Sequence, residues 1–90
     1  MAQKQYANKR DANEAEIIDA LKAYGASVIQ MDKIDLIVGY KGKTHVMEVK
    51  NPLTSWTVQP SQQRMINDWV GSPIHIVTTK EQAINIVENY

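Results

Sequence analysis

Two short apolar runs joined by Lys41-Gly42-Lys43 constrain the fold of this chain most strongly. Asp35 to Tyr40 and Thr44 to Lys50 each have the length and apolar content of a β-strand. A short link that contains glycine is typical of a tight turn, so we predict a β-hairpin. Asn51-Pro52 ends the second strand, because proline cannot continue a central ladder.

Helical periodicity predicts an element on each side of this hairpin. Residues 12–24 carry apolar residues at helical spacing, with a capping box of Asp11 and Glu14 at the start and Gly25 as a stop. Pro60 suits the first turn of a second helix, whose apolar stripe contains Trp69. We expect Tyr24 and Trp69 to belong to the core.

The remaining segments complete an α-β-β-β-α-β-α order. Residues 27–31 and 74–77 are predicted strands, and Thr79 with Gln82 forms a capping box that opens a last helix. The connection through the second helix predicts a right-handed crossover and a parallel strand pair. The expected fold is α/β, a small mixed sheet flanked by helices over residues 11–90, preceded by a loose basic tail over residues 1–10.

Composition excludes several classes of protein. Ninety residues make one domain. The chain has no cysteine and no apolar run of roughly 18 residues, so we expect a soluble, cytoplasmic protein with no membrane span. The formal net charge is zero, whereas a protein that only coats DNA usually has a basic excess.

Glu48 and Lys50 are the residues that most need a chemical explanation. Alternate strand residues share a face, so both point the same way and Val49 points opposite. Their neighbours Val46, Met47 and Val49 are apolar. Because a buried charge is costly unless it is paired or bound to metal, the pattern favours a functional site. The plainer interpretation is a solvated strand face with a cross-strand ion pair.

The position of Asp35 depends on the hairpin register. A two-residue turn at Lys41-Gly42 places Asp35 opposite Glu48, and a four-residue link places it opposite Lys50. Either closure brings Asp35 to the Glu48 and Lys50 face. A three-residue loop without a bulge places it on the other face, and the sequence does not decide between the three.

Two carboxylates and a lysine on one face suit phosphodiester hydrolysis. Carboxylates form a hard oxygen site for a divalent cation, most plausibly Mg²⁺. The metal would polarise a phosphoryl oxygen and help to generate hydroxide, while Lys50 orients the attacking water and stabilises developing charge. Glu14 and Gln62 extend the core-facing stripes of the first and second helices, so both are candidates for the same site. Each could instead only cap its own helix.

The motifs together resemble a known nuclease family. Asp35 followed by Glu48-Val49-Lys50 resembles the PD-(D/E)xK signature. Arg10-Asp11-Ala12-Asn13-Glu14, Asp35-Leu36-Ile37-Val38-Gly39, Met47-Glu48-Val49-Lys50 and Pro60-Ser61-Gln62 resemble the virus-type replication-repair nuclease (VRR-NUC) domain, in its stand-alone phage and bacterial form. The resemblance covers Arg10 to Val87. Ile34 stands where the family usually has proline.

The resemblance implies a restriction-endonuclease-like αβββαβ core and a homodimeric, metal-dependent DNA endonuclease that cuts branched DNA such as Holliday junctions. The expected location is a bacterial or phage-infected host cell. It implies that Asp35, Glu48, Lys50 and Gln62 are catalytic, and that Glu14, Asp35, Glu48 and the peptide oxygen of Val49 bind Mg²⁺, with Mn²⁺ expected to substitute.

Other residues have two interpretations. Lys9, Arg10, Lys41 and Lys43 are candidate phosphate contacts or plain solvated surface. Trp56 could stack on a base, or pack under its own loop or in a dimer contact. His45 and His75 are interpreted as packed or exposed strand residues, because no spacing suggests zinc. The alternative function is a non-catalytic DNA-binding or assembly module that keeps the nuclease fold.

Overall fold

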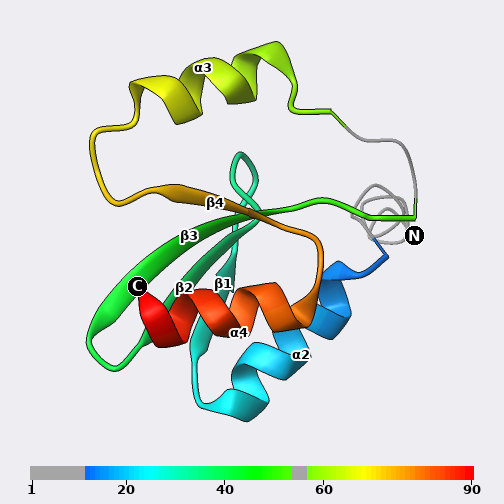
Figure 1. The fold of residues 1–90 in the computed structure, drawn as a ribbon, viewed down its shortest axis with the longest axis vertical. Coiled ribbons are helices and arrows are strands. Elements are labelled where there is room, and N and C mark those ends of the chain that lie inside the picture. The colour runs from blue at the N-terminus through cyan, green and yellow to red at the C-terminus, as the bar shows by residue number, and fades with distance from the viewer. Residues whose placement is uncertain (1–11, 54–56) are drawn as a thin grey trace.

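The chain forms a four-stranded sheet with three helices in the expected order. The computed structural model describes residues 12–53 and 57–90, and elements carry the labels of Figure 1. Asp11 and Trp56 lie outside these residues, and so does the predicted contact of Trp56. The first helix begins at Glu14 with Asn13 as its N-cap residue, so its start lies two residues after the predicted one. The elements are α2 (Glu14–Tyr24), β1 (Ser27–Gln30), β2 (Leu36–Tyr40), β3 (Lys43–Val49), α3 (Pro60–Asp68), β4 (Ile74–Val77) and α4 (Lys80–Asn89).

The sheet is mixed, as the sequence predicted. Its strand order is β1-β2-β3-β4, with β1, β2 and β3 antiparallel and β4 parallel to β3. This arrangement is compatible with an αβββαβ core. Within the two described ranges, no helix has the length and apolar character needed to cross a membrane.

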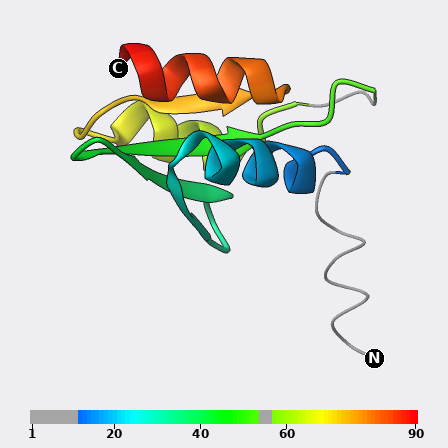
Figure 2. The same cartoon turned by 90° about the horizontal axis from the view of Figure 1, so that it is seen from below.

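Helices cover the two faces of the sheet unequally. Helices α2 and α4 pack against each other on one face, and α3 lies on the opposite side (Figure 1). Figure 2 shows the same sheet from below, with α4 lying along it. The core lies under α2 and α4, whereas α3 contains no buried residue. The core residues are Ile17, Ile18, Leu21, Ala26, Leu36, Val38, Met47, Val49, Val77, Ala83, Ile86 and Val87.

The hairpin closes with a two-residue turn. Tyr40 pairs with Lys43, and the intervening Lys41 and Gly42 have φ values of 48° and 80°. Positive φ at both central residues is the backbone pattern of a type I′ turn, whose twist matches that of the flanking strands. Of the closures left open by the sequence, this is the one that the chain adopts.

Two aromatic residues lie outside the expected core. Tyr24 is 36% exposed and Trp69 is 48% exposed. Tyr24 is the last residue of α2, where its ring packs on Tyr40 and its hydroxyl donates a hydrogen bond to Glu88. Trp69 follows the end of α3, and its indole lies over Gly71. The prediction that both belong to the core was wrong. Helical spacing shows which residues share a face of the helix, but it does not show whether the end of the helix lies at the protein surface.

Candidate active site

Asp35 lies beside the carboxyl end of β3. Leu36 pairs with Met47, so the next position outward places Asp35 opposite Glu48. The Val49 N–H donates a 2.8 Å hydrogen bond to Asp35 Oδ2. Asp35 is therefore held on the end of β3 by a backbone donor as well as by the register.

Glu48 and Lys50 lie on the sheet face that α3 covers. Met47 and Val49 are 0% and 1% exposed and pack in the core under α2 and α4. Strand alternation therefore turns the intervening Glu48 to the other face, where it is still only 5% exposed. A carboxylate this buried requires polar partners, and α3 and Lys50 provide them.

Glu48, Lys50 and Gln62 form one polar network. Gln62 Nε2 donates a 2.8 Å hydrogen bond to Glu48 Oε2, and Lys50 Nζ lies 3.4 Å from the same oxygen. Lys50 Nζ also donates to Gln62 Oε1 at 3.3 Å. The structure thus brings Gln62 to Glu48 and Lys50, the placement expected for a residue of the same site.

The backbone of α3 and of Lys50 fixes this network. Gln62 is the third residue of α3, and its Oε1 also accepts a hydrogen bond from the N–H of the N-cap residue Gln59 at 3.4 Å. The Lys50 N–H donates to the Val77 carbonyl at 2.9 Å, and the Lys50 carbonyl accepts from Asn13 Nδ2 at 3.0 Å. The last residue of the motif is therefore held through both of its main-chain groups.

Glu48 retains an oxygen without a partner. Its Oε1 is buried and accepts no hydrogen bond from the residues that the structure describes, which normally costs about 1–3 kcal/mol. In an antiparallel pair, the N–H and C=O of one residue face the same neighbour, so the Val49 carbonyl lies on the Asp35 side, as its N–H does. Carboxylate and peptide oxygens are the ligands that Mg²⁺ prefers. Asp35, Glu48 and Val49 thus fit the metal that the resemblance implies.

Glu14 does not join this pair of carboxylates. It is 3% exposed on the stripe of α2 that includes Ile17 and Leu21, which packs on the core face of the sheet. In the part of the chain that the structure describes, no three His, Cys, Asp or Glu side chains form a group that could hold a metal ion. The four-ligand set expected from the resemblance is thus only partly assembled, because α2 covers the face opposite Glu48.

The candidate phosphate-binding lysines of the hairpin lie far from this site. Lys41 and Lys43 are at the turn, where β3 begins, whereas the site is at the other end of β3. Six residue-to-residue steps lead from Lys43 to Val49, which corresponds to about 20 Å at about 3.3 Å per step. Lys9 and Arg10 lie outside the described residues.

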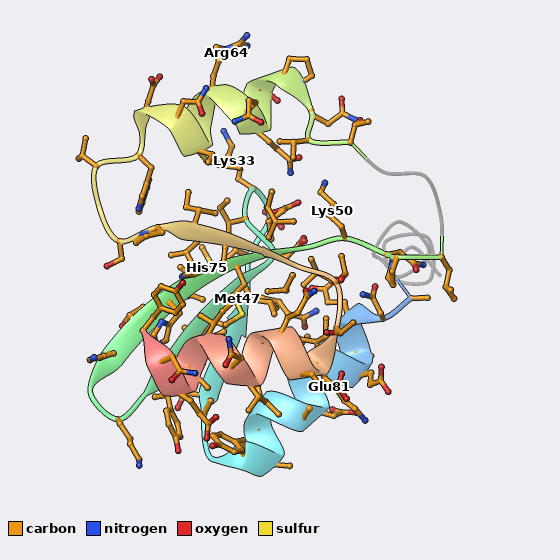
Figure 3. The ribbon with its side chains drawn as sticks, in the orientation of Figure 1. Lys33, Met47, Lys50, Arg64, His75 and Glu81 are labelled. Atoms are coloured by element: carbon orange, nitrogen blue, oxygen red, sulfur yellow. The ribbon has the colours of Figure 1, made fainter. Side chains whose placement is uncertain are left out.

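A basic pocket that the sequence did not reveal adjoins the site. It has a volume of about 440 Å³ and is lined by Lys33, Ser61, Gln62 and Met65. Lys33 belongs to the loop between β1 and β2 and extends towards α3, and Arg64 is exposed on α3 (Figure 3). The antiparallel order of β1, β2 and β3 could have indicated this, because it places that loop at the end of the sheet where β3 finishes.

Comparisons with protein-family models, curated proteins and solved structures found no match. The interpretation of the site therefore rests on the geometry described above and on the motifs in the sequence.

Proposed function

We propose that this protein is a divalent-metal-dependent deoxyribonuclease that hydrolyses phosphodiester bonds. The observation that supports this most directly is the buried Oε1 of Glu48, which has no hydrogen-bond partner and lies in the network that contains Lys50 and Gln62. Asp35 lies opposite Glu48 and supplies a second carboxylate. A buried carboxylate oxygen that accepts no hydrogen bond is available as a ligand, and a bound cation would stabilise its charge.

Each side chain has a distinct task in this proposal. Asp35, Glu48 and the Val49 carbonyl would hold Mg²⁺, which would supply Lewis-acid polarisation and a nucleophilic water. The Lys50 ammonium, held by Glu48 and Gln62, orients the attacking water and stabilises negative charge that develops on the phosphoryl group. Gln62 holds both charged groups in position.

Branched DNA and a homodimeric state are part of the proposal and rest on the family resemblance. Two copies of the site would cut two strands of one junction. Exposed apolar residues on the α3 side of the sheet, Ile29 and Ile76, provide surface that a second copy could cover. Light scattering gives the mass in solution. A monomeric mass would contradict the proposal that two copies of the site cut two strands of one junction.

The test of activity is a panel of single-stranded, duplex, flap and four-way DNA, with Mg²⁺ or with EDTA. We expect cutting with Mg²⁺ and none with EDTA. Asp35→Asn and Lys50→Ala should each reduce the rate by at least about 100-fold. Each factor of ten corresponds to about 1.4 kcal/mol of lost transition-state stabilisation, so a 100-fold loss corresponds to twice that energy. Asp32→Asn is the matched control, since Asp32 is exposed in the same loop as Asp35. Unchanged cutting by folded Asp35→Asn would show that the site is misassigned.

The second candidate function is a non-catalytic DNA-binding or assembly module. The position of Glu14 favours it, because among the described residues no three His, Cys, Asp or Glu side chains form a group that could hold a metal ion. Calorimetry with Mg²⁺ or Mn²⁺ separates the two functions. The nuclease should bind the metal and lose that binding on Glu48→Gln, whereas the module should bind DNA with no metal dependence.

A further inference from the structure

A second polar pocket lies at the end of the sheet opposite the candidate active site. It has a volume of about 400 Å³, between the start of β3, the start of β4 and the last residue of the chain after α4. The nuclease proposal uses none of its residues except Lys43, a candidate DNA contact. The lining residues are Lys43, Thr44, His45, Ser72, Pro73, His75 and Tyr90.

His45 is the residue of this pocket that lacks a partner. It is 4% exposed, and its Nε2 is buried without a hydrogen bond. The cost of such a group is about 1–3 kcal/mol. Because the atom has almost no exposed surface, a ligand in the pocket reaches it only if the ring turns towards the pocket. The packing of β3 does not require a histidine at position 45, since an apolar residue would fill the same core-facing position.

The other lining groups are mostly hydrogen-bond donors. Lys43 Nζ donates a 3.0 Å hydrogen bond to the main-chain oxygen of Tyr90. Two of the three hydrogens of the Lys43 ammonium are then left to bind a ligand. The His75 ring meets the Tyr90 ring edge-on at 4.8 Å. Ser72 and Thr44 add hydroxyl groups. No acidic side chain is among the described residues that line the pocket.

The electrostatics of the pocket favour an anion. Burial and then the nearby Lys43 charge lower the pKa of His45, and burial and then His45 lower the pKa of His75. An anion beside His45 would offset the part of this lowering that comes from the Lys43 charge, and not the larger part that comes from burial. The C-terminal end of α4 adds a partial negative charge, which the Lys43 ammonium offsets.

We propose that this pocket binds a phosphate group, through the Lys43 ammonium, the His45 imidazole and the Ser72 hydroxyl. Phosphate accepts several hydrogen bonds at once, and the groups named here supply them. The phosphate could be a free one, inorganic or on a nucleotide, or a backbone phosphate of DNA. The inference does not depend on the nuclease proposal, because a phosphate site can exist on a protein that cuts nothing.

The test uses the full chain and follows the imidazole resonances of His45 and His75 by NMR. Inorganic phosphate is added at millimolar concentration, with sodium chloride of matched ionic strength as the control. We expect both rings to shift with phosphate and not with chloride. Lys43→Gln should weaken phosphate binding about tenfold, which corresponds to about 1.4 kcal/mol. Ser72→Ala should weaken it less, and Lys41→Gln, on the same turn but outside the pocket, should leave it unchanged.

Duplex DNA in a second titration assigns the source of the phosphate. If DNA shifts the same two rings and Lys43→Gln removes the shift, the ligand is a backbone phosphate. If only inorganic phosphate shifts them, the ligand is a free phosphate. The proposal is overturned if phosphate has no more effect than chloride, if Lys41→Gln weakens binding as much as Lys43→Gln, or if Zn²⁺ shifts the rings and phosphate does not.

Discussion

Gln62 Nε2 donates a 2.8 Å hydrogen bond to Glu48 Oε2 and so joins α3 to β3. The same amide accepts from Lys50 through its oxygen, so its two ends match the two charges that it meets. Because α3 buries no side chain, this polar contact is one of the main links between that helix and the sheet. Gln62 thus positions the motif residues and also helps to hold α3 over them.

Gln62 is a half-buried residue, yet its replacement should disturb the positions of both Glu48 and Lys50. We expect Gln62→Ala to lower the rate of metal-dependent cutting by about 10–100-fold, the usual effect of removing a residue that orients a ligand. Gln63→Ala is the matched control, because Gln63 is exposed and its side chain donates a hydrogen bond to Asn67 within α3. Steady-state cleavage rates measure both. Equal loss in the two variants would mean that α3, rather than the Gln62 amide, matters.

The basic residues near the site predict where a DNA strand runs. Lys33 lines the pocket that Gln62 also lines, whereas Lys41 lies at the far end of the hairpin. Lys33→Glu should weaken DNA binding about tenfold, or about 1.4 kcal/mol, and lower the salt dependence of binding. Lys41→Glu makes the same charge change and should have less effect on DNA binding. Fluorescence anisotropy over a range of salt concentrations measures both variants. A larger effect of Lys41→Glu would show that the DNA strand does not run past Lys33.

Local patterns predicted the hairpin and the pairing of its functional residues. Strand alternation placed Glu48 and Lys50 on one face, and one of the three possible turn lengths placed Asp35 opposite Glu48. These properties depend on backbone geometry within a few residues, so a single sequence contains them. Gln62 was a candidate for the same site from its place on the stripe of the second helix and from the resemblance, and the structure shows both its contact with Glu48 and its role in the helix cap.

Properties that depend on packing between distant elements were not predictable in the same way. The stripe of α2 indicated correctly that Glu14 is buried, but not which face of the sheet α2 covers. Lys33 lies in a loop with no periodic signal, and only the assembled sheet brings it beside Gln62. The exposure of Trp69 depends on how far α3 extends past the sheet.

The unequal covering of the sheet predicts a large difference between two leucines. Leu36 follows Asp35 and is 0% exposed in the core under α2 and α4, whereas Leu53 is 90% exposed. Leu36→Ala should lower the free energy of unfolding by about 2–5 kcal/mol through lost burial and a cavity. Leu53→Ala removes the same atoms and should change it by less than about 0.5 kcal/mol. Urea denaturation measures both values, and similar losses would contradict the assigned core.

Stability should fall as the pH drops through the range in which histidine titrates. Burial, and then the charge of Lys43, lower the pKa of His45 below its ordinary value of 6.5, and burial, and then His45, do the same for His75. The unfolded chain therefore binds protons first, so the free energy of unfolding is at its full value above pH 6.5 and decreases towards the lower folded pKa values.

Urea denaturation at a series of pH values from 8 down to 5.5 measures this decrease. His75→Gln should remove the share of the slope that belongs to His75 and leave that of His45. Most carboxylates stay ionised in this range, because their ordinary pKa values are near 4, so they contribute little to the slope. A free energy of unfolding that stays constant or increases as the pH falls below 6.5 would show that burial and the Lys43 charge do not act on His45, nor burial and His45 on His75, as described.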